Sequence, residues 1–185
     1  MDNNIDIQSD GINVFATLKV GASKTGIRIV SIFILTEIII FIFLANQAFS
    51  DKDIKMFLIL ITIFIIFIGF PIKYLLWNTY GKEYLIVNTK SLSFYYDYGF
   101  FKTRLRTIKF RDLASGFDKI HLKDNKEYGK ILFYDYNKDN NLPELIHETT
   151  VILSSDQAEK LISEIHKVFL DQYFDEMDFV SFSSN

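Results

Sequence analysis

IVSIFILTEIIIFIFLANQAF (29–49) and MFLILITIFIIFIGFPIKYLL (56–76) are the two stretches that decide the fold of this chain. Each approaches the roughly 20 residues that an α-helix needs to cross the hydrocarbon of a bilayer. Neither shows the polar stripe of an amphipathic surface helix. We therefore expect helices over 29–49 and 54–77 within a transmembrane hairpin over 27–77. Ser50 or Asp51, in the short turn, is expected to cap the second helix.

Two other classes of segment are disfavoured. A buried helix pair in a soluble protein would need more covering chain than 185 residues provide. A cleaved signal peptide has a shorter apolar region nearer the N-terminus, and no second run follows it at once.

The bulk composition narrows the function classes. A net charge of −3 argues against nucleic acid as a partner, because phosphate binding needs a basic face. The absence of Cys excludes disulfides and thiolate metal sites. The 19 Phe and 10 Tyr residues indicate β-structure outside the apolar runs.

The charges and aromatic residues beside the apolar runs predict an orientation. The Lys and Arg residues at the outer ends of the runs outnumber those of the turn, where acids balance Lys52 and Lys55. By the positive-inside rule, both termini are expected in the cytoplasm of a bacterial inner membrane. Tyr74, Trp77 and Tyr80 are expected to form an aromatic belt at that interface.

Short strands are predicted on both sides of the hairpin. Within an N-terminal tail (1–26), residues 12–20 alternate strictly, with Val14, Ala16 and Leu18 on the apolar face. We expect this strand to dock as an edge strand on a sheet that starts at Glu83, after a loose start over 1–11. Further strands are predicted over 83–88, 91–98, 101–110, 113–122, 130–137 and 149–153, with a polar loop over 137–148.

The C-terminal part predicts a helix that lies on this sheet. Ser154-Ser-Asp-Gln157 forms a capping box. An apolar stripe then continues to about Tyr173: Ala158, Leu161, Ile162, Ile165, Val168 and Phe169. Residues 174–185 alternate acids with aromatics and are interpreted as a tail.

Strands followed by one C-terminal helix are the plan of a pleckstrin-homology (PH) domain. The chain resembles the bacterial PH-like membrane proteins, including the YcxB-like group, over YLIVNTKSLSFYYDYGFFKTRLRTIKFRDLASGF (84–117) and TTVILSSDQAEKLISEIHKVF (149–169). The Trp that often precedes the Asp in that family is absent here, where Phe110 and Arg111 stand. The resemblance implies a cytoplasmic PH-like sandwich or barrel over 82–173, a scaffold or accessory role and no reaction. The expected fold class is thus an α+β membrane protein.

Glu37 is the one ionisable residue of the first apolar run. A carboxylate near mid-bilayer costs several kcal/mol, so such residues usually face a partner or a polar path. It is either a protonated Glu tolerated in the hairpin, hydrogen-bonded to Thr36 or Thr62, or a contact in an oligomer or conduit. Both readings stay open.

Basic residues gather in the 101–111 segment. Lys102, Arg104 and Arg106 alternate, so a strand there would place all three on one face. Lys109 and Arg111 extend the cluster. It is either a patch for anionic lipid headgroups or an ordinary solvated strand face.

No catalytic or metal site is predicted. His121, His147 and His166 are scattered without ligand spacing, and no nucleophile motif occurs. We therefore expect no enzyme and no cofactor. The first hypothesis is a membrane-anchored scaffold or adaptor that binds a protein partner. The alternative is a subunit of an oligomeric membrane assembly (immunity, defence or transport accessory) that uses Glu37 in the bilayer.

Overall fold

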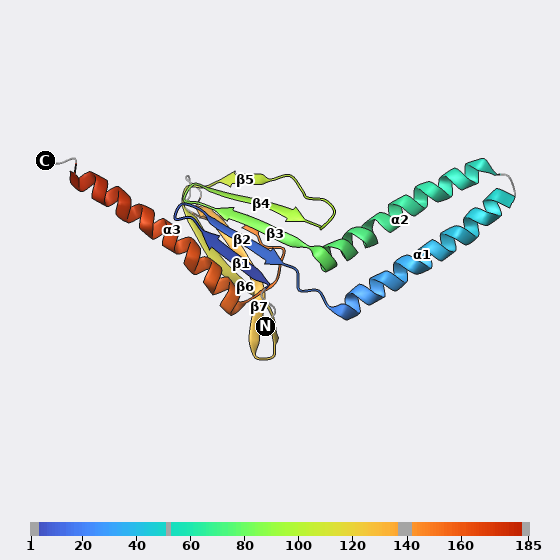
Figure 1. Ribbon diagram of the computed structural model, residues 1–185, viewed down its shortest axis with the longest axis horizontal. Helices are drawn as coiled ribbons and strands as arrows, with labels where there is room; N and C mark the ends of the chain where they lie inside the picture. Colours follow the sequence, from blue (N-terminus) through green and yellow to red (C-terminus); the bar gives the residue numbers. More distant parts are fainter. Residues whose placement is uncertain (1–3, 51–52, 137–141, 183–185) are drawn as a thin grey trace. The chain divides into compact units, whose positions relative to one another are not determined.

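The computed structural model describes residues 4–50, 53–136 and 142–182, with side chains up to Leu170. The described chain has two long apolar helices, two antiparallel sheets and a C-terminal helix, which is an α+β architecture (Figure 1). It divides into two compact units. The helical unit comprises residues 22–81 and 98–100, and the sheet unit comprises the remainder.

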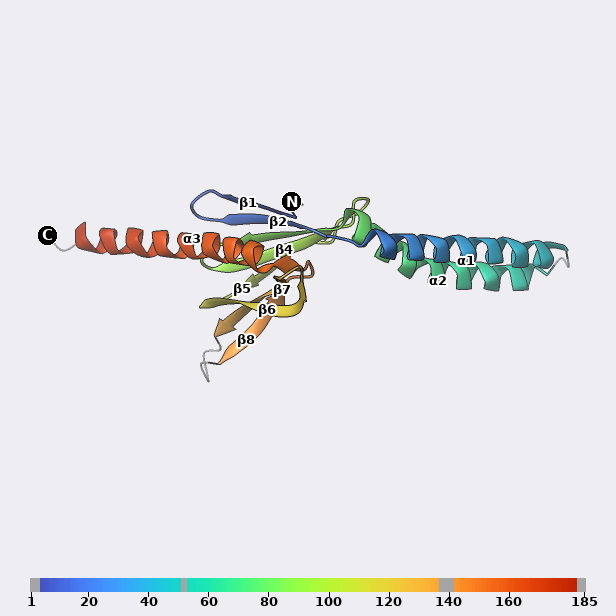
Figure 2. The same ribbon diagram turned by 90° about the horizontal axis from the view of Figure 1, so that it is seen from below.

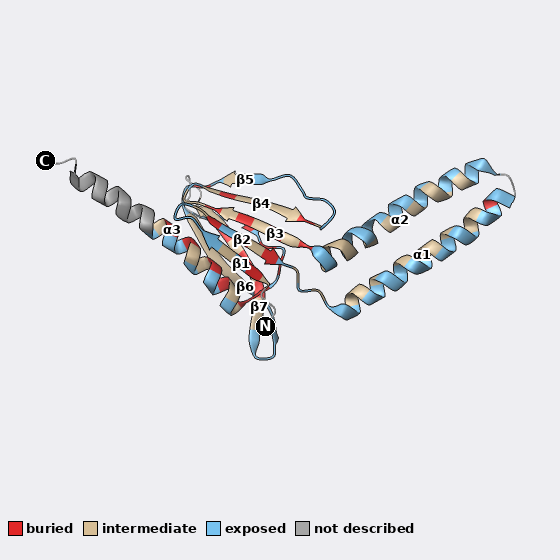
Figure 3. Ribbon diagram, in the orientation of Figure 1, coloured by how far each residue is buried: buried red, intermediate tan, exposed pale blue. Residues whose placement is uncertain are grey.

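The helical unit is an antiparallel pair, α1 (Lys24–Ser50) and α2 (Ile54–Tyr80), of 27 residues each. At 1.5 Å per residue each helix is about 40 Å long, and both are long and apolar enough to span a membrane. Phe41 stacks on Phe64 between them, with ring centroids 4.1 Å apart. Most of their remaining surface is exposed (Figure 3).

The helices are longer than the sequence predicted, and the cap of α2 lies elsewhere. Asp53 is the N-cap, because its carboxylate accepts a 3.0 Å hydrogen bond from the backbone N–H of Met56. The Ser50 hydroxyl instead donates to the carbonyl of Asn46 in α1, and Asp51 lies outside the described residues. The predicted cap at Ser50 was wrong.

A five-stranded sheet, sheet A, begins before the hairpin and continues after it. Its strands are β1 (Ile5–Ser9), β2 (Val14–Lys19), β3 (Lys82–Val87), β4 (Ser91–Asp97) and β5 (Arg106–Lys109), paired in that order. β2 pairs antiparallel with β3 from Val14↔Val87 to Lys19↔Lys82. In the sequence, the helical hairpin therefore separates β2 and β3, which are neighbours in sheet A.

The expected edge position of residues 12–20 was wrong, because β1 pairs with the free side of β2. Residues 1–11 contain this strand rather than only a loose start. The turn between β1 and β2 is built by Asp10, whose carboxylate accepts from the backbone N–H groups of Ile12 and Asn13 at 2.9 and 2.6 Å. Gly11 supplies the positive φ of +86°.

A second sheet, sheet B, contains β6 (Leu113–Lys123), β7 (Lys126–Tyr136) and β8 (Pro143–Glu148), with β9 (Leu153–Ser154) also paired to β7. Figure 2 shows β6, β7 and β8 to one side of sheet A. β8 occupies part of the segment that the sequence assigned to a polar loop. Residues 137–141 of that segment lie outside the described residues.

The helix α3 (Ser155–Phe182) starts at the predicted capping box. The backbone N–H of Ser154 donates to the Gln157 side chain at 3.1 Å, and that of Gln157 donates to the Ser154 hydroxyl at 3.4 Å. The predicted stripe is buried at Ala158, Leu161, Ile165 and Val168 and half-buried at Ile162 and Phe169. The helix continues beyond Tyr173, so residues 174–182 of the predicted tail are helical.

The core of the sheet unit is formed by the inner faces of both sheets and this stripe. Among the described residues, the fully buried apolar side chains include Val14, Leu18, Leu85, Val87, Leu92, Ile131, Phe133, Leu153, Leu161 and Ile165. Each large aliphatic side chain buried in this way contributes about 1.5–3 kcal/mol relative to an exposed one. Two strands from before the hairpin and the strands after it therefore share one core.

Candidate functional site

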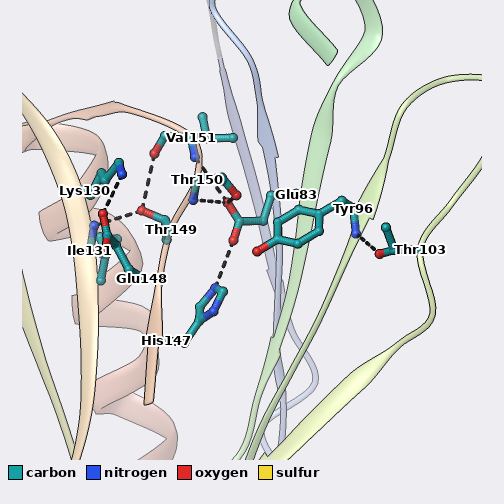
Figure 4. A network of polar contacts seen from close by, with 10 residues as sticks. All are labelled: Glu83, Tyr96, Thr103, Lys130, Ile131, His147, Glu148, Thr149, Thr150 and Val151. Carbon is teal, nitrogen blue, oxygen red and sulfur yellow. Dashed lines mark hydrogen bonds and ion pairs between the residues drawn. The ribbon is translucent and has the colours of Figure 1, made fainter. Parts of the chain in front are cut away.

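A buried carboxylate lies at the junction of the two sheets. Glu83, in β3, is fully buried on the inner face of sheet A, between apolar neighbours at alternate positions. Its Oε2 accepts from the backbone N–H of Thr150 at 2.7 Å, from the Thr150 hydroxyl at 2.9 Å and from the N–H of Val151 at 3.2 Å. Its Oε1 lies 2.9 Å from Nε2 of His147 in β8 (Figure 4).

The imidazole of His147 lies close to two aromatic rings, one from each sheet. Its ring centroid lies 4.0 Å from that of Phe94 in sheet A and 6.1 Å from that of Phe133 in sheet B. The hydrogen bond between Nε2 of His147 and Oε1 of Glu83 connects β8 of sheet B with β3 of sheet A. The imidazole therefore joins the sheets both by packing and by a hydrogen bond.

Thr149 shapes the loop that brings these donors to Glu83. Its hydroxyl accepts from the N–H of Ile131 at 2.9 Å, and its own N–H donates to the carbonyl of Ile131, also at 2.9 Å. The hydroxyl in turn lies 3.3 Å from the carbonyl of Val151. Residues 149–151 are thus fixed to β7, with the N–H groups of Thr150 and Val151 directed at Glu83 (Figure 4).

This network is suited to holding the sheets together rather than to chemistry. Both oxygens of Glu83 are occupied, and no part of the residue is exposed to a substrate. His147 is 7% exposed. In the described part of the chain, no group of three or more His, Asp or Glu side chains could hold a metal ion. We therefore interpret Glu83 and His147 as a structural clamp.

Sequence reasoning missed this pair, because the two residues lie 64 positions apart. One local signal was present: Glu83 falls on the apolar face of the alternation Lys82-Glu-Tyr-Leu-Ile-Val87. A carboxylate in such a position needs buried donors. The sequence does not show which donors these are.

Glu37, the predicted intramembrane residue, lies in α1 with its Oε2 enclosed and without a hydrogen-bond partner in the described structure. The hydroxyls expected to serve it are used elsewhere. Thr36 donates to the carbonyl of Ile32 at 3.0 Å, and Thr62 donates to that of Leu58 at 2.9 Å. Neither hydroxyl therefore donates to the enclosed Oε2 of Glu37 in the described structure.

The predicted belt residues lie in the last turns of α2. Two aromatic residues of the segment after β4 pack against them. Tyr98 packs against Trp77 with centroids 5.0 Å apart, and Phe100 meets Tyr80 edge-on at 5.9 Å. The ammonium of Lys73 lies 5.6 Å from the centroid of Tyr98, within range of a cation–π contact. Tyr74 is exposed.

The predicted basic strand face was wrong. Only residues 106–109 of the expected strand are β5, and Lys102 makes an isolated bridge with Asp97. Lys102 and Arg104 are therefore not on the strand that holds Arg106. Lys102 also forms an ion pair with Asp97 at 3.5 Å, and Lys109 is exposed in β5.

Arg111 lies in the corner between the sheets. Its guanidinium pairs with Asp112 at 3.1 Å, and the backbone N–H groups of both residues donate to Asp135 in β7. Partial burial acts to raise the pKa of Asp135, but these backbone donors and the charge of Arg111 outweigh it and hold the pKa below its usual range. The corner is thereby anchored to sheet B.

The outer face of sheet A carries a second feature, which we call the aromatic face: Phe15, Tyr84, Ile86 and Tyr95. Phe15 lies opposite Ile86, and Tyr84 lies opposite Tyr95. The two Tyr rings stack with centroids 4.6 Å apart at 5°. Phe15 is 40% exposed and the other three are half-buried. Small polar residues surround them, with Ser93 and Thr107 hydrogen-bonded at 2.8 Å.

Two substitutions of Glu83 test how much its hydrogen bonds contribute to the stability of the sheet unit. Glu83→Ala leaves the N–H groups of Thr150 and Val151 unpaired, and a buried donor left without an acceptor costs about 1–3 kcal/mol. Glu83→Gln keeps one oxygen for these donors and should cost less. The measurement is guanidinium unfolding of the full chain in detergent, followed by near-ultraviolet circular dichroism. Lys82→Ala, on the opposite face, is the control. Equal losses for Ala and Gln would contradict the clamp.

Comparisons with known proteins assign no family. No protein-family model, no curated protein and no solved structure matches the chain. The resemblance to the PH-like membrane proteins therefore stays a prediction from the sequence.

Proposed function

We propose that this chain is a membrane-anchored scaffold that binds a protein partner through the aromatic face. The observation that carries the proposal is the stacked Tyr84–Tyr95 pair beside Phe15 and Ile86 on the outer face of a sheet. Aromatic residues are enriched in the cores of protein interfaces, where rigid rings bury a large area at little entropic cost. The sheet unit has its own core, so this face needs no role in folding.

The PH-like assignment is part of this proposal, and it starts from the order of the elements in the sheet unit. Apart from β1, a four-stranded antiparallel sheet is followed by a second antiparallel sheet and a C-terminal helix on the core. The resemblance implies antiparallel strands closed by one C-terminal helix and placed after the hairpin, whereas β2 precedes the hairpin. The assignment favours a binding module over an enzyme.

The proposal places α1 and α2 across a bacterial inner membrane with both termini in the cytoplasm. Two features support it. Both helices are long enough to span and mostly exposed, and the Lys and Arg excess lies at their outer ends. The pairing of β2 with β3 requires the two outer ends to emerge on the same side.

The orientation is tested with single cysteines in this Cys-free chain. Ser50→Cys lies at the end of α1 and Ser163→Cys is exposed on α3. In cells with a permeabilised outer membrane, a membrane-impermeant maleimide should label position 50 and leave position 163 unlabelled until the inner membrane is opened. Labelling of position 163 in intact cells would contradict the orientation.

Partner binding is tested by photo-crosslinking in cells. A benzoylphenylalanine at Tyr95 should give a discrete light-dependent adduct, because this ring lies within the aromatic face. The same residue at Lys160, exposed on α3, is the control. The adduct should disappear when Tyr84→Arg is added, since a charge there must lose its water on binding. No adduct at Tyr95, or equal adducts at both positions, would refute this surface.

The second candidate is a subunit of an oligomeric membrane assembly, and the enclosed, unpartnered oxygen of Glu37 favours it. In an oligomer, the hairpin would have to repack so that a donor from another copy reaches this oxygen, which the single chain encloses and leaves unpaired. Glu37→Leu should then reduce the mass of the particle in mild detergent from oligomer to monomer, and Glu37→Gln should preserve it. If the wild-type protein is a monomer in mild detergent, the oligomeric assembly is refuted and only the scaffold proposal remains.

A further inference from the structure

The segment between β4 and β5 carries exposed apolar and basic side chains together. Phe100 is 78% exposed, Phe101 45% and Leu105 55%. Lys102, Arg104 and Arg106 lie among them and are also exposed, with Lys102 paired to Asp97 at 3.5 Å. No acidic residue occurs between Tyr98 and Arg111. This combination of apolar and cationic side chains suits an anionic lipid surface, where rings enter the interface and cations meet phosphates.

The tip of this segment is tied to the end of α2. Phe100 and Tyr98 pack on Tyr80 and Trp77, as described above, and Tyr98–Phe100 belongs to the helical unit. Gly99 is needed for this approach. Its φ is +88°, and a Cβ there would lie 2.7 Å from the Cβ of Tyr80. The contact therefore sets Phe100 beside the last residue of α2.

The length of α2 indicates how deep its last residue, Tyr80, would lie in a membrane. A helix of about 40 Å exceeds the roughly 30 Å of hydrocarbon and reaches the headgroup region at its ends. Tyr80 and the Phe100 beside it would then lie at headgroup depth. Aromatic rings are favoured at this level.

We propose that residues 98–106 form a second membrane contact, in which Phe100 and Phe101 insert into the interface of an anionic leaflet and Lys102, Arg104 and Arg106 face lipid phosphates. The proposal rests on the membrane-spanning hairpin but not on a protein partner. The proposed contact replaces the strand-face patch expected from the sequence with the segment between β4 and β5 and the first residue of β5.

The test places a nitrobenzoxadiazole label on single cysteines of the full chain in proteoliposomes. Phe100→Cys reports on the loop, Ile40→Cys on the middle of α1, and Lys160→Cys on α3. The vesicles contain phosphatidylcholine with or without phosphatidylglycerol, plus spin-labelled lipid as quencher. Labels at 40 and 100 should be quenched, with a blue-shifted emission, whereas the label at 160 should not. Quenching at 100 should be stronger with phosphatidylglycerol.

The basic side chains are tested in the Phe100→Cys background. Replacing Lys102, Arg104 and Arg106 with Gln should lower the ratio of inserted to withdrawn loop in anionic vesicles by about fivefold per charge. Replacing Lys119, Lys123 and Lys126 with Gln changes the net charge equally and should have little effect. Equal losses from both triple variants would overturn the headgroup contact.

The outcomes separate this proposal from the one on which it rests. If position 40 is quenched and position 100 matches position 160, the hairpin spans the membrane and the loop contact is refuted. If neither 40 nor 100 is quenched, the spanning hairpin fails and the loop contact fails with it. A protein partner on the loop would shield the label at 100 only in cells, so quenching in purified proteoliposomes identifies lipid.

Discussion

The pairing of β2 with β3 is the constraint on which the rest of the structure depends. These strands are neighbours in sheet A, yet the entire helical hairpin separates them in the chain. Paired strands lie about 4.8 Å apart, so the outer ends of α1 and α2 must return to nearly the same place. An antiparallel helix pair satisfies this requirement, since packed helices lie 8–10 Å apart. The hairpin is thus a long connection within one sheet.

The sheet formed in this way still has to be joined to sheet B, and polar groups do much of this. Glu83 follows the end of α2 by only a few residues, and its carboxylate collects donors from β8 and the loop after it. Asp135 makes the reciprocal connection, holding the corner after β5 to β7. Since satisfied buried polar groups specify one arrangement, these contacts fix how the sheets meet where apolar packing alone would tolerate alternatives.

The parts of the fold that sequence reasoning predicted are those with local causes. The apolar runs, the alternation in β2 and the capping box at Ser154 are each readable within a short window. β1 was missed although Asp10-Gly11 is a hairpin signal, because its alternation covers only residues 5–8. β8 was missed because most of its side chains are exposed. The strand over 101–110 was overextended, because the contact of Tyr98–Phe100 with α2 is not local.

The same distinction applies to the sites. Glu37 was singled out because a carboxylate in an apolar run is conspicuous in any window. Glu83 is equally conspicuous on its strand, but its donors come from residues more than 60 positions away. The aromatic face also needed the register of three strands before its members became neighbours.

The register of β2 and β3 also sets an order of events during synthesis. β1 and β2 leave the ribosome first, and a lone two-stranded ribbon is marginally stable in water. Their partner β3 is translated only after both helices, and the donors for Glu83 come later still. The nascent N-terminal strands must therefore wait for the hairpin to turn the chain back toward them. If the hairpin spans a membrane, as proposed, it must insert before β2 and β3 can pair and the sheet unit can complete its folding.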